Sequence, residues 1–455
     1  MARGKKAEQA LTPEEKLEQA LVPAEEQPYV VPGNWCWTDI GSINHYTGLS
    51  IDPMKRPDMI FELYSVPSSA FDYPEIITGS EIGSAKQSVI KNDVLLCKIN
   101  PRINRVWKVV QYTDNELMAS SEWIVVRNVI INPDYLMFCF KTQYFREFML
   151  SNVSGVGGSL MRAQPKFVKN YPIPIAPIAE QQRIVDRIER LFFKLDEAKK
   201  KAQAVLDGFE LRKSAILHNA FTGELTIHWR KEHGLELDSW TERMLKDCGD
   251  WYGGGTPSMA HPEYWENGEL LWITSKDMKS DVIEDTLMHT NRIGVNNSSA
   301  NYIEKPSILF VMRSGILRRT LPIAMVKVPF TVNQDLKVIS PVDDLNLEYF
   351  FWGCKNSEKK ILNTCMKNGT TVESINAKAL MSFKISVASQ AEQIEIVNCI
   401  VSLLDKEQQA KEAAESVLTQ IDTMKKSILS RAFRGELGTN DPTEESALEL
   451  LKTIL

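Results

Sequence analysis

The 455-residue sequence has no run of about twenty consecutive apolar residues, so a membrane-spanning helix is not expected. The basic residues near the N-terminus are not followed by the apolar segment of a signal peptide, which favours a cytoplasmic protein. The seven cysteines form no Cys-x-x-Cys pair, and the six histidines show no metal-ligand spacing. We therefore expect reduced, buried thiols and no metal site.

The usual signatures of catalysis are also missing. The sequence has no G-K-[ST] phosphate loop, no complete G-x-G-x-x-G and no F-x-G-x-G methyl-donor loop. We find no Ser/His/Asp or Cys/His set and no nuclease-like cluster of carboxylates with a lysine. The glycine-rich segments GVGG (155–158) and GGGTP (253–257) are interpreted as loops, although the amides of such loops can also meet phosphates.

One segment resembles a catalytic motif and has a simpler interpretation. NPDY at 132–135 is similar to the N-P-P-Y of amino-methyltransferases, but its third residue is Asp134. The equivalent segment later in the chain begins at Asn346 and reads NLEY. An asparagine N-cap followed by an acid in the first turn predicts the start of a helix in both places.

The chain does contain an internal repeat. Residues 180–225 align without a gap to residues 392–437, and 20 of these 46 positions are identical. The phrase AFTGEL (220–225) returns as AFRGEL (432–437), and Gly223 and Gly435 are expected to terminate helices. Weaker similarity extends the repeat to the preceding regions, for example from 93–100 to 307–314. An internal repeat of this kind sets the architecture.

Both copies have apolar residues spaced alternately by three and four, with one polar step in each copy, at Arg212 and at Glu407. This spacing predicts the seam of a coiled coil over more than four heptads. The predicted seam consists of Ile184, Ile188, Leu191, Ala198, Ala202 and Val205 in the first copy, and of Ile396, Ile400, Leu403, Ala410, Ala414 and Val417 in the second. A long helix lying on a globular core is less favoured, because two such seams in one chain can cover each other.

Each helix, predicted over 180–221 and 392–433, would be roughly 60 Å long. Because the first helix leads away from one globular region and the second must return, we expect an antiparallel pair with a pseudo-two-fold axis and one domain at each end. Short β-branched runs predict strands at 94–97, 124–126, 308–312 and 336–339, and helices are predicted at 135–149 and 348–363. The fold class is therefore α+β. The predicted boundaries are an N-terminal arm at 1–33, domains at 34–177 and 227–388, long helices at 178–226 and 389–437, and a tail at 438–455.

The net charge of −6 gives no general affinity for nucleic acid, but charge is unevenly distributed. Residues 94–113 and 305–334, which are equivalent in the repeat, contain no acid and several bases. Such windows suit phosphate and base contacts, although each alone would also fit an ordinary solvated surface. The candidate DNA contacts are Lys98, Asn100, Arg102, Arg105 and Lys108 in the first domain, and Lys276, Arg313, Ser314, Arg318 and Arg319 in the second.

Two diverged domains, each followed by a long helix that opens with E-Q (P-x-x-E-Q at Pro177–Gln181 in the first copy) and closes with A-F-x-G-E-L, resemble the DNA-specificity subunit of type I restriction–modification enzymes. Further similar segments are YPIPIAPIAEQQRIV (171–185) and GDWYGGGTPS (249–258). The second copy, SVASQAEQ (386–393), lacks the P-I-P approach of the first. The resemblance covers essentially the whole chain.

The resemblance implies a non-catalytic reader of an asymmetric, bipartite double-stranded DNA target, with one target-recognition domain for each half-site. The two long helices would act as a spacer and would bind two methylation subunits and, beyond these, restriction subunits. It also implies no cofactor in this chain, with S-adenosylmethionine, ATP and Mg²⁺ in the partner subunits. A fused methyltransferase or nuclease and a coiled-coil scaffold that does not read DNA remain the alternatives.

Overall fold

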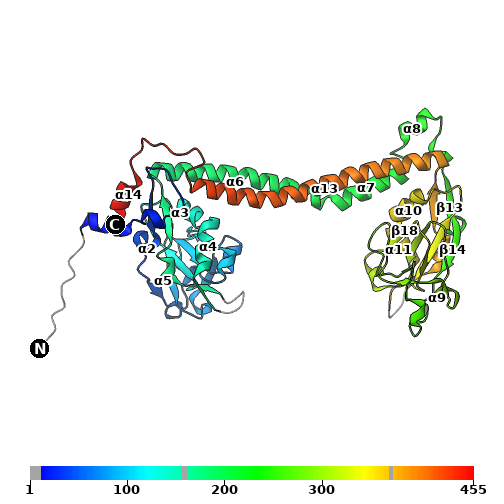
Figure 1. Ribbon diagram of the computed structural model, residues 1–455, viewed down its shortest axis with the longest axis horizontal. Helices are drawn as coiled ribbons and strands as arrows, with labels where there is room; N and C mark the ends of the chain where they lie inside the picture. Colours follow the sequence, from blue (N-terminus) through cyan, green and yellow to red (C-terminus); the bar gives the residue numbers. More distant parts are fainter. Residues whose placement is uncertain (1–11, 156–160, 368–371) are drawn as a thin grey trace. The chain divides into compact units, whose positions relative to one another are not determined.

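The structure is a computed structural model that describes residues 12–155, 161–367 and 372–455. The chain forms two compact units. Unit 1 consists of Met1–Ala202 and Ser416–Leu455, and unit 2 of Gln203–Glu415. Each unit contains strands and helices and part of both long helices, as Figure 1 shows. In the described part of the chain, no helix has the length and apolar character needed to cross a membrane.

Unit 1 is built on two main sheets. One has five strands in the order β2-β5-β8-β3-β4, and the other has three in the order β7-β6-β9. Strands β3 and β8 are parallel, and the strand pairings of the three-stranded sheet are antiparallel. A separate antiparallel pair, β1 with β12, leads into the long helix. The strand bounds are β1 Cys36–Asp39, β2 Ser50–Ile51, β3 Ile60–Tyr64, β4 Glu75–Thr78, β5 Lys86–Ser88, β6 Val94–Cys97, β7 Val106–Lys108, β8 Glu116–Ala119, β9 Trp123–Val126, β10 Val153–Ser154, β11 Arg162–Ala163 and β12 Pro172–Ile175.

Unit 2 has a related arrangement. Its sheets have the orders β14-β20-β17-β18 and β16-β15-β19, with β15 and β19 parallel, and the pair β13 with β23 leads into the second long helix. The strand bounds are β13 Thr241–Met244, β14 Gly249–Gly253, β15 Leu270–Ile273, β16 His289–Thr290, β17 Ser307–Val311, β18 Ile323–Val326, β19 Phe330–Val332, β20 Leu336–Pro341, β21 Met366–Lys367, β22 Ser374–Ile375 and β23 Lys384–Val387. All four strands predicted from β-branched runs are present, at β6, β9, β17 and β20.

The two predicted domain helices each consist of two shorter helices. Residues 135–149 fall in α3 and α4, which are separated at Lys141 and Thr142, and residues 348–363 fall in α10 and α11, which are separated at Ser357. Asn132 and Asn346 cap α3 and α10 by accepting two backbone N–H groups each, which confirms the helix-start interpretation of NPDY. The helix bounds are α1 Pro13–Ala20, α2 Ile40–Ile43, α3 Pro133–Phe140, α4 Gln143–Ser151, α5 Pro165–Val168, α6 Ile178–Asp207, α7 Phe209–Phe221, α8 Ile227–Glu232, α9 Arg292–Asn296, α10 Leu347–Asn356, α11 Glu358–Cys365, α12 Ala377–Ser382, α13 Gln390–Ala432 and α14 Ala447–Ile454.

The long helices pair in antiparallel fashion within each unit. In unit 1, Asp196 of α6 contacts Lys425 of α13, while Arg183, earlier in α6, contacts Glu444, beyond the end of α13. In unit 2 the Phe209 ring faces Lys411 and Arg212 faces Glu407. Residue numbers rise along one helix as they fall along its partner, which confirms the predicted antiparallel pairing.

The seam prediction is correct for α6 and partly wrong for α13. Ile184, Ile188, Ala202, Ile396, Ile400 and Ala414 are buried, and Leu191, Ala198, Val205 and Leu403 are half-buried. Ala410 and Val417 are instead exposed, whereas Lys411 and Leu418 beside them are half-buried. An α-helix drifts by about 20° per heptad relative to a 3.5-residue repeat, so over several heptads the contact stripe moves to a neighbouring position.

The first long helix is interrupted at Gly208, where the sequence analysis predicted continuity. A Cβ atom at Gly208 would lie 2.3 Å from Nη1 of Arg212. The same guanidinium donates to the Val205 carbonyl at 2.8 Å and to Glu407 at 2.7 Å. The equivalent of Gly208 in the second copy is Gln420, and α13 is continuous there over 43 residues. The two polar seam positions, one in each copy, therefore pair with each other.

A buried carboxylate connects the start of each long helix to the segment that follows the end of the other. Glu392, in the first turn of α13, is fully buried and accepts hydrogen bonds from Thr226, Arg230 and Trp240. Its counterpart Glu180 in α6 accepts from Trp35, Thr439 and Asn440. We call these two clusters the carboxylate latches. The positive end of each helix dipole adds to the stabilisation of the buried charge.

The glutamine that follows each buried glutamate connects the long helix to its domain. Oε1 of Gln181 accepts from the backbone N–H of Asn132 at 2.9 Å, and Oε1 of Gln393 accepts from that of Asn346 at 2.8 Å. The E-Q pair at the start of each long helix thus contacts the segment after the other long helix through its glutamate, and its own domain through its glutamine. At the other end of the repeat, Gly223 and Gly435 have φ values of 81° and 73° directly after the helices, as predicted for C′ glycines.

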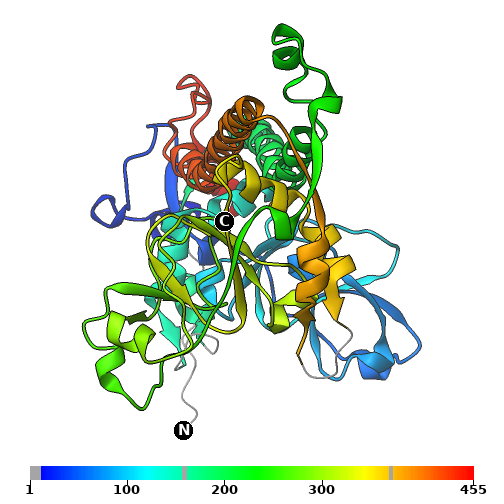
Figure 2. The same cartoon turned by 90° about the vertical axis from the view of Figure 1, so that its right-hand side faces the viewer.

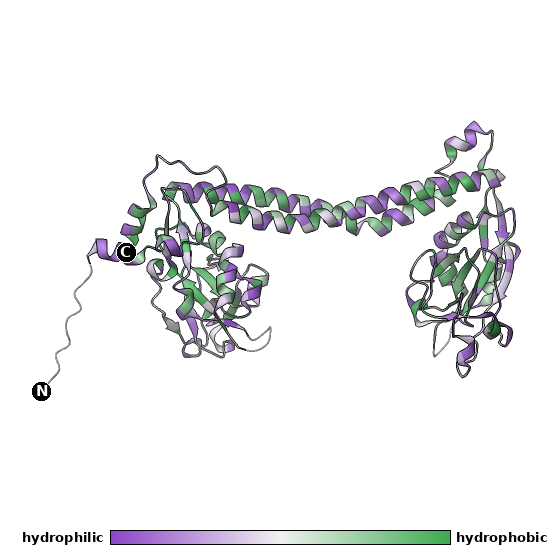
Figure 3. Ribbon diagram, viewed as in Figure 1, coloured by the Kyte–Doolittle hydropathy of each residue, from purple (hydrophilic) through white to green (hydrophobic). Residues whose placement is uncertain are grey.

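Aromatic packing repeats between the units as well. Tyr135 lies against Phe433 in unit 1, and Tyr349 lies against Phe221 in unit 2. Figure 3 shows the strands inside each unit as mainly hydrophobic, while hydrophobic and hydrophilic residues alternate along α6 and α13. Helix α8, which carries Arg230, stands clear of the sheets of unit 2 in Figures 1 and 2.

We expect the latch of unit 2 to be the more sensitive to substitution. Arg230→Ala would leave Glu392 buried without its cation and should lower the free energy of unfolding by about 3–5 kcal/mol. Asn440→Ala in unit 1 removes one neutral donor from Glu180 and should cost only about 1 kcal/mol. Chemical denaturation of both variants measures the difference, and equal losses would contradict this account of the latches.

The seam pair can be tested by exchanging its charges. Arg212→Glu or Glu407→Arg alone places like charges opposite each other, and the double exchange restores their attraction. Because both side chains are partly exposed, we expect a coupling free energy of about 1 kcal/mol in a double-mutant cycle of unfolding. A coupling of zero would show that the two residues do not recognise each other.

Candidate nucleic-acid interface

The two acid-free windows form the same element in both units. In unit 1, residues 98–105 connect the antiparallel strands β6 and β7 and include a 3₁₀ turn at Pro101–Ile103. In unit 2, residues 312–322 connect β17 and β18 and include a 3₁₀ turn at Gly315–Arg318. We call these segments the basic loops. Each begins where a fully buried strand ends, so its backbone is anchored by the core.

In the basic loop of unit 1, Arg102 is exposed, and Lys98 and Arg105 are half-buried. Asn100 has φ 49° and donates its backbone N–H to Met161, so the turn itself favours asparagine at this position. Lys108 lies within β7, and its ammonium is 2.5 Å from Oδ1 of Asp134 on the first turn of α3. Lys108 therefore forms an ion pair with an acid on α3. Its role as a DNA contact stays a prediction.

In unit 2, Arg313, Arg318 and Arg319 are exposed on the basic loop. Ser314 caps the 3₁₀ turn by accepting the backbone N–H of Ile316. Lys276 is also exposed, but it follows β15, a strand of the other sheet, and is not part of the basic loop. The structure thus brings together four of the five residues predicted in this unit.

A second segment lies beside each basic loop and was not predicted as part of the interface. Ile99 forms a β-bridge with Arg162, and Arg313 forms the equivalent bridge with Ser374. These bridges bring strands β11 and β22 to the basic loops. Two acids lie beside them: Glu373 directly precedes β22, and Glu122 directly precedes β9. Glu122 binds Arg162, and Glu373 binds Arg318. The hydrogen bond from Arg318 lowers the pKa of Glu373, and the hydrogen bond to Glu122 raises the pKa of Arg162.

Sequence reasoning missed these acids because both lie outside the acid-free windows, Glu122 beyond Thr113 and Glu373 beyond Gln334. One signal was available, since Arg162 lies shortly after the glycine-rich segment GVGG, separated from it by Ser159, Leu160 and Met161. Most of that segment lies outside the described residues.

The other glycine-rich loop has a packing role. A Cβ at Gly254 would lie 2.1 Å from the Asn333 carbonyl oxygen, and one at Gly255 would lie 2.4 Å from the Ser299 hydroxyl. The Gly255 N–H donates to the Val332 carbonyl. GGGTP therefore requires glycine because the backbone packs closely here, which supports its interpretation as a structural loop.

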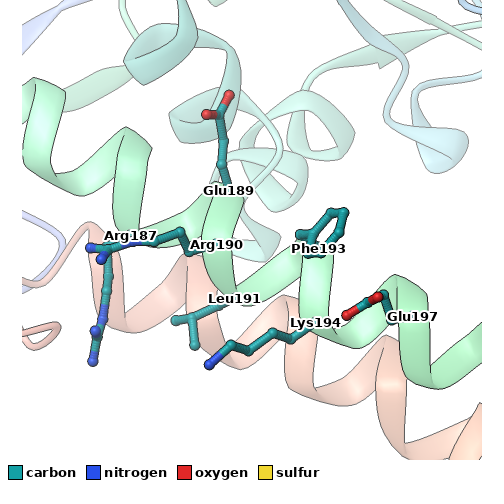
Figure 4. Close-up of a pocket in the computed structure, with 7 residues that line it drawn as sticks. All are labelled: Arg187, Glu189, Arg190, Leu191, Phe193, Lys194 and Glu197. Atoms are coloured by element: carbon teal, nitrogen blue, oxygen red, sulfur yellow. The ribbon is translucent and has the colours of Figure 1, made fainter.

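The outer side of α6 carries a different kind of surface. An open hollow of about 460 Å³ is lined by helix residues that include Arg187, Arg190, Phe193 and Lys194, as Figure 4 shows. The Phe193 side chain is 65% exposed, although its neighbour Phe192 packs against Phe138. Two acids, Glu189 and Glu197, also line the hollow. An exposed aromatic ring among charged side chains on a helix favours contact with another protein.

Within the described residues, no group of three or more His, Cys, Asp or Glu side chains could hold a metal ion. The described cysteines are all free thiols. Burial raises the pKa of Cys36 to about 12 and that of Cys248 to about 11, so these thiols stay protonated at neutral pH.

Comparison with known proteins identifies a shared family in both units. The family model of the type I restriction modification DNA specificity domain matches residues 61–206 and 238–416. The specificity subunit of the type I restriction enzyme EcoR124I/EcoR124II from Escherichia coli is 40% identical over 41% of this chain, and the match covers about half (48%) of that relative. The HindI specificity subunit from Haemophilus influenzae is 22% identical, with 89% of this chain and 100% of the relative covered.

Solved structures share the fold. The HsdS subunit from Thermoanaerobacter tengcongensis aligns with a TM-score of 0.67 at 20% identity, covering 90% of this chain and 100% of that subunit. A chain from a structure of complex assembly and conformational transition in a type I R-M system aligns with a TM-score of 0.66 at 21% identity and covers the same shares.

The arrangement of charges predicts which lysine affects the salt dependence of DNA binding. Replacing Lys98 and Arg102 together by alanine should reduce the slope of log K against log salt by about 1.8, since each phosphate contact contributes about 0.9. Lys108→Met should lower the thermal stability instead and leave that slope unchanged, because its ammonium is paired with Asp134. Binding titrations of the assembled complex at several salt concentrations measure both slopes. A slope that falls for Lys108→Met alone would reverse the assignment.

Proposed function

The chain belongs to the family of type I restriction–modification DNA specificity proteins, and from this membership we propose that it reads a bipartite double-stranded DNA target, with one domain for each half-site. The observation that carries the proposal is the repeated interface. Both units place a basic loop between equivalent strands and bring a second strand to it through an equivalent β-bridge.

The two interfaces share a backbone arrangement and differ in side chains. The first loop presents Lys98, Arg102 and Arg105, and the second presents Arg313, Arg318 and Arg319. Because base recognition depends on individual side chains while the backbone arrangement sets their position, the two half-sites should differ in sequence. The target is therefore asymmetric.

We assign no catalytic step to this chain. Burial raises the pKa of the Cys36 and Cys248 thiols, so these two stay protonated, and the polar residues near the basic loops serve turns, bridges and ion pairs. S-adenosylmethionine, ATP and Mg²⁺ would act in partner subunits, which carry the methylation and restriction chemistry in the cytoplasm. Incubating the purified chain alone with DNA and a labelled methyl donor tests this assignment, and incorporation of label would make the chain a methyltransferase.

The outward faces of the long helices are the proposed surface for two methylation subunits, through which restriction subunits would join. Phe193 of α6 and Ile394 and Val401 of α13 are large apolar side chains that point away from the seam, and they are 65%, 55% and 49% exposed. The net charge of −6 of this chain is compatible with DNA binding if the partner subunits supply part of the positive charge that neutralises the phosphates.

The spacer role predicts the effect of an insertion. One heptad placed after Asp196 in α6 and one placed before Lys425 in α13 enter at facing positions, because these two residues form an ion pair. The insertion adds about 10 Å of helix and should lengthen the tolerated gap by about three base pairs. Methylome sequencing of cells that express the variant with its cognate methylation subunit measures both half-sites and the gap.

The control is the unaltered chain in the same cells, which gives the reference target. Unchanged half-sites with a longer gap are expected. A changed half-site with the original gap would mean that the helices do not set the spacing.

A further inference from the structure

Each interface holds one arginine by a carboxylate. In unit 2, Nε of Arg318 donates to Oε1 of Glu373. The carbonyl of Glu373 accepts the backbone N–H of Ser314, so the acid is fixed to the same loop that carries the arginine. The second oxygen, Oε2 of Glu373, is buried and has no hydrogen-bond partner among the described residues. The carboxylate is therefore held by its surroundings and directs the guanidinium.

The hydrogen bond to Glu373 leaves the terminal amino groups of Arg318 free to bind another partner. Only Nε is bound, the side chain is 69% exposed, and its two terminal amino groups have no partner within the described part of the chain. A guanidinium presents donors in a rigid planar fork that matches two neighbouring acceptors. In the major groove, O6 and N7 of guanine form such a pair.

Unit 1 has a related pair in a different position. Nε and Nη2 of Arg162 donate to Glu122 at 3.2 and 3.3 Å. Arg162 corresponds to Ser374 in the repeat, so here the arginine comes from the bridging strand, while in unit 2 it comes from the basic loop. The two interfaces thus hold a guanidinium near equivalent β-bridges, but the arginine belongs to a different one of the two bridged segments in each unit.

We propose that Arg318 reads a guanine in the half-site of the second domain and that Glu373 is the positioning residue that holds its fork. This inference rests on the proposed function. A phosphate contact would fit the geometry less well, because the negative charge of Glu373 beside the guanidinium repels a phosphate, whereas guanine O6 and N7 are neutral acceptors. Arg313 and Arg319 on the same loop have no acid partner among the described residues and suit the phosphates better.

The test uses the complex assembled with its methylation subunit and duplexes in which each base pair of the target is changed in turn. Arg318→Lys keeps the charge and removes the fork. It should reduce discrimination at one G·C pair of one half-site by about tenfold or more, and leave binding to random DNA unchanged. Glu373→Gln keeps the side-chain shape and should weaken discrimination at the same pair, with equal or tighter binding to random DNA.

A modified base sharpens the result. Replacing that guanine by 7-deazaguanine removes N7 and should weaken binding of the unaltered complex, while the Arg318→Lys complex should show no further loss. Arg319→Lys on the same loop is the matched control and should leave base preference unchanged. Arg162→Lys should affect only the other half-site.

An equal loss on all sequences, or a change at a position that is not guanine, would overturn the assignment of Arg318. A loss with Arg318→Lys that Glu373→Gln does not share would overturn the role of Glu373. Thermal unfolding of each variant separates these results from misfolding. If the unaltered complex shows no sequence preference, it is the proposed function that fails, and that outcome is distinct from the others.

Discussion

The buried carboxylate at the start of each long helix is the interaction on which the rest of the structure depends. A carboxylate without water must be surrounded by donors, and Glu180 and Glu392 obtain theirs from segments that lie far away in the sequence. Those donors follow the end of the opposite long helix or precede the first strand of the domain. The latches therefore join domain, outgoing helix and returning helix at one point in each unit.

Chain order differs between the two latches although their contacts correspond. In unit 2 the segment after α7 runs directly through α8 into β13, so the donors of Glu392 belong to one continuous stretch. In unit 1 the equivalent stretch is divided between the C-terminal tail and the N-terminal arm. Asn34 joins the two parts, since its side chain and carbonyl contact Asp441, Asn440 and Ala447. Unit 1 therefore needs residues from both the N-terminal arm and the C-terminal tail.

A constant frame with variable loops explains how one architecture can serve two recognition surfaces. The capping asparagines, the glutamines that bind them and the tyrosine–phenylalanine contacts recur in both units. The charged residues on the basic loops do not correspond one to one, and the two arginine–glutamate pairs are assembled from different segments of their units. Variation in the loops is tolerated because the strands that precede them, β6 and β17, are fully buried in both units.

The sequence by itself determined the repeat, the two long helices, their antiparallel pairing, the helix caps at Asn132 and Asn346 and the glycine stops, because each depends on local spacing or on connectivity. It also located the basic loops through their lack of acids. Only the tertiary structure decided that Lys108 pairs with Asp134, that Gly208 interrupts the first helix, and that Ala410 and Val417 turn away from the seam. The pairing of Arg162 and Arg318 with glutamates likewise needed three-dimensional information. These features arise from side chains that meet across about 25 to 195 residues of sequence, or from the small drift of a helix against its repeat, and local pattern contains neither.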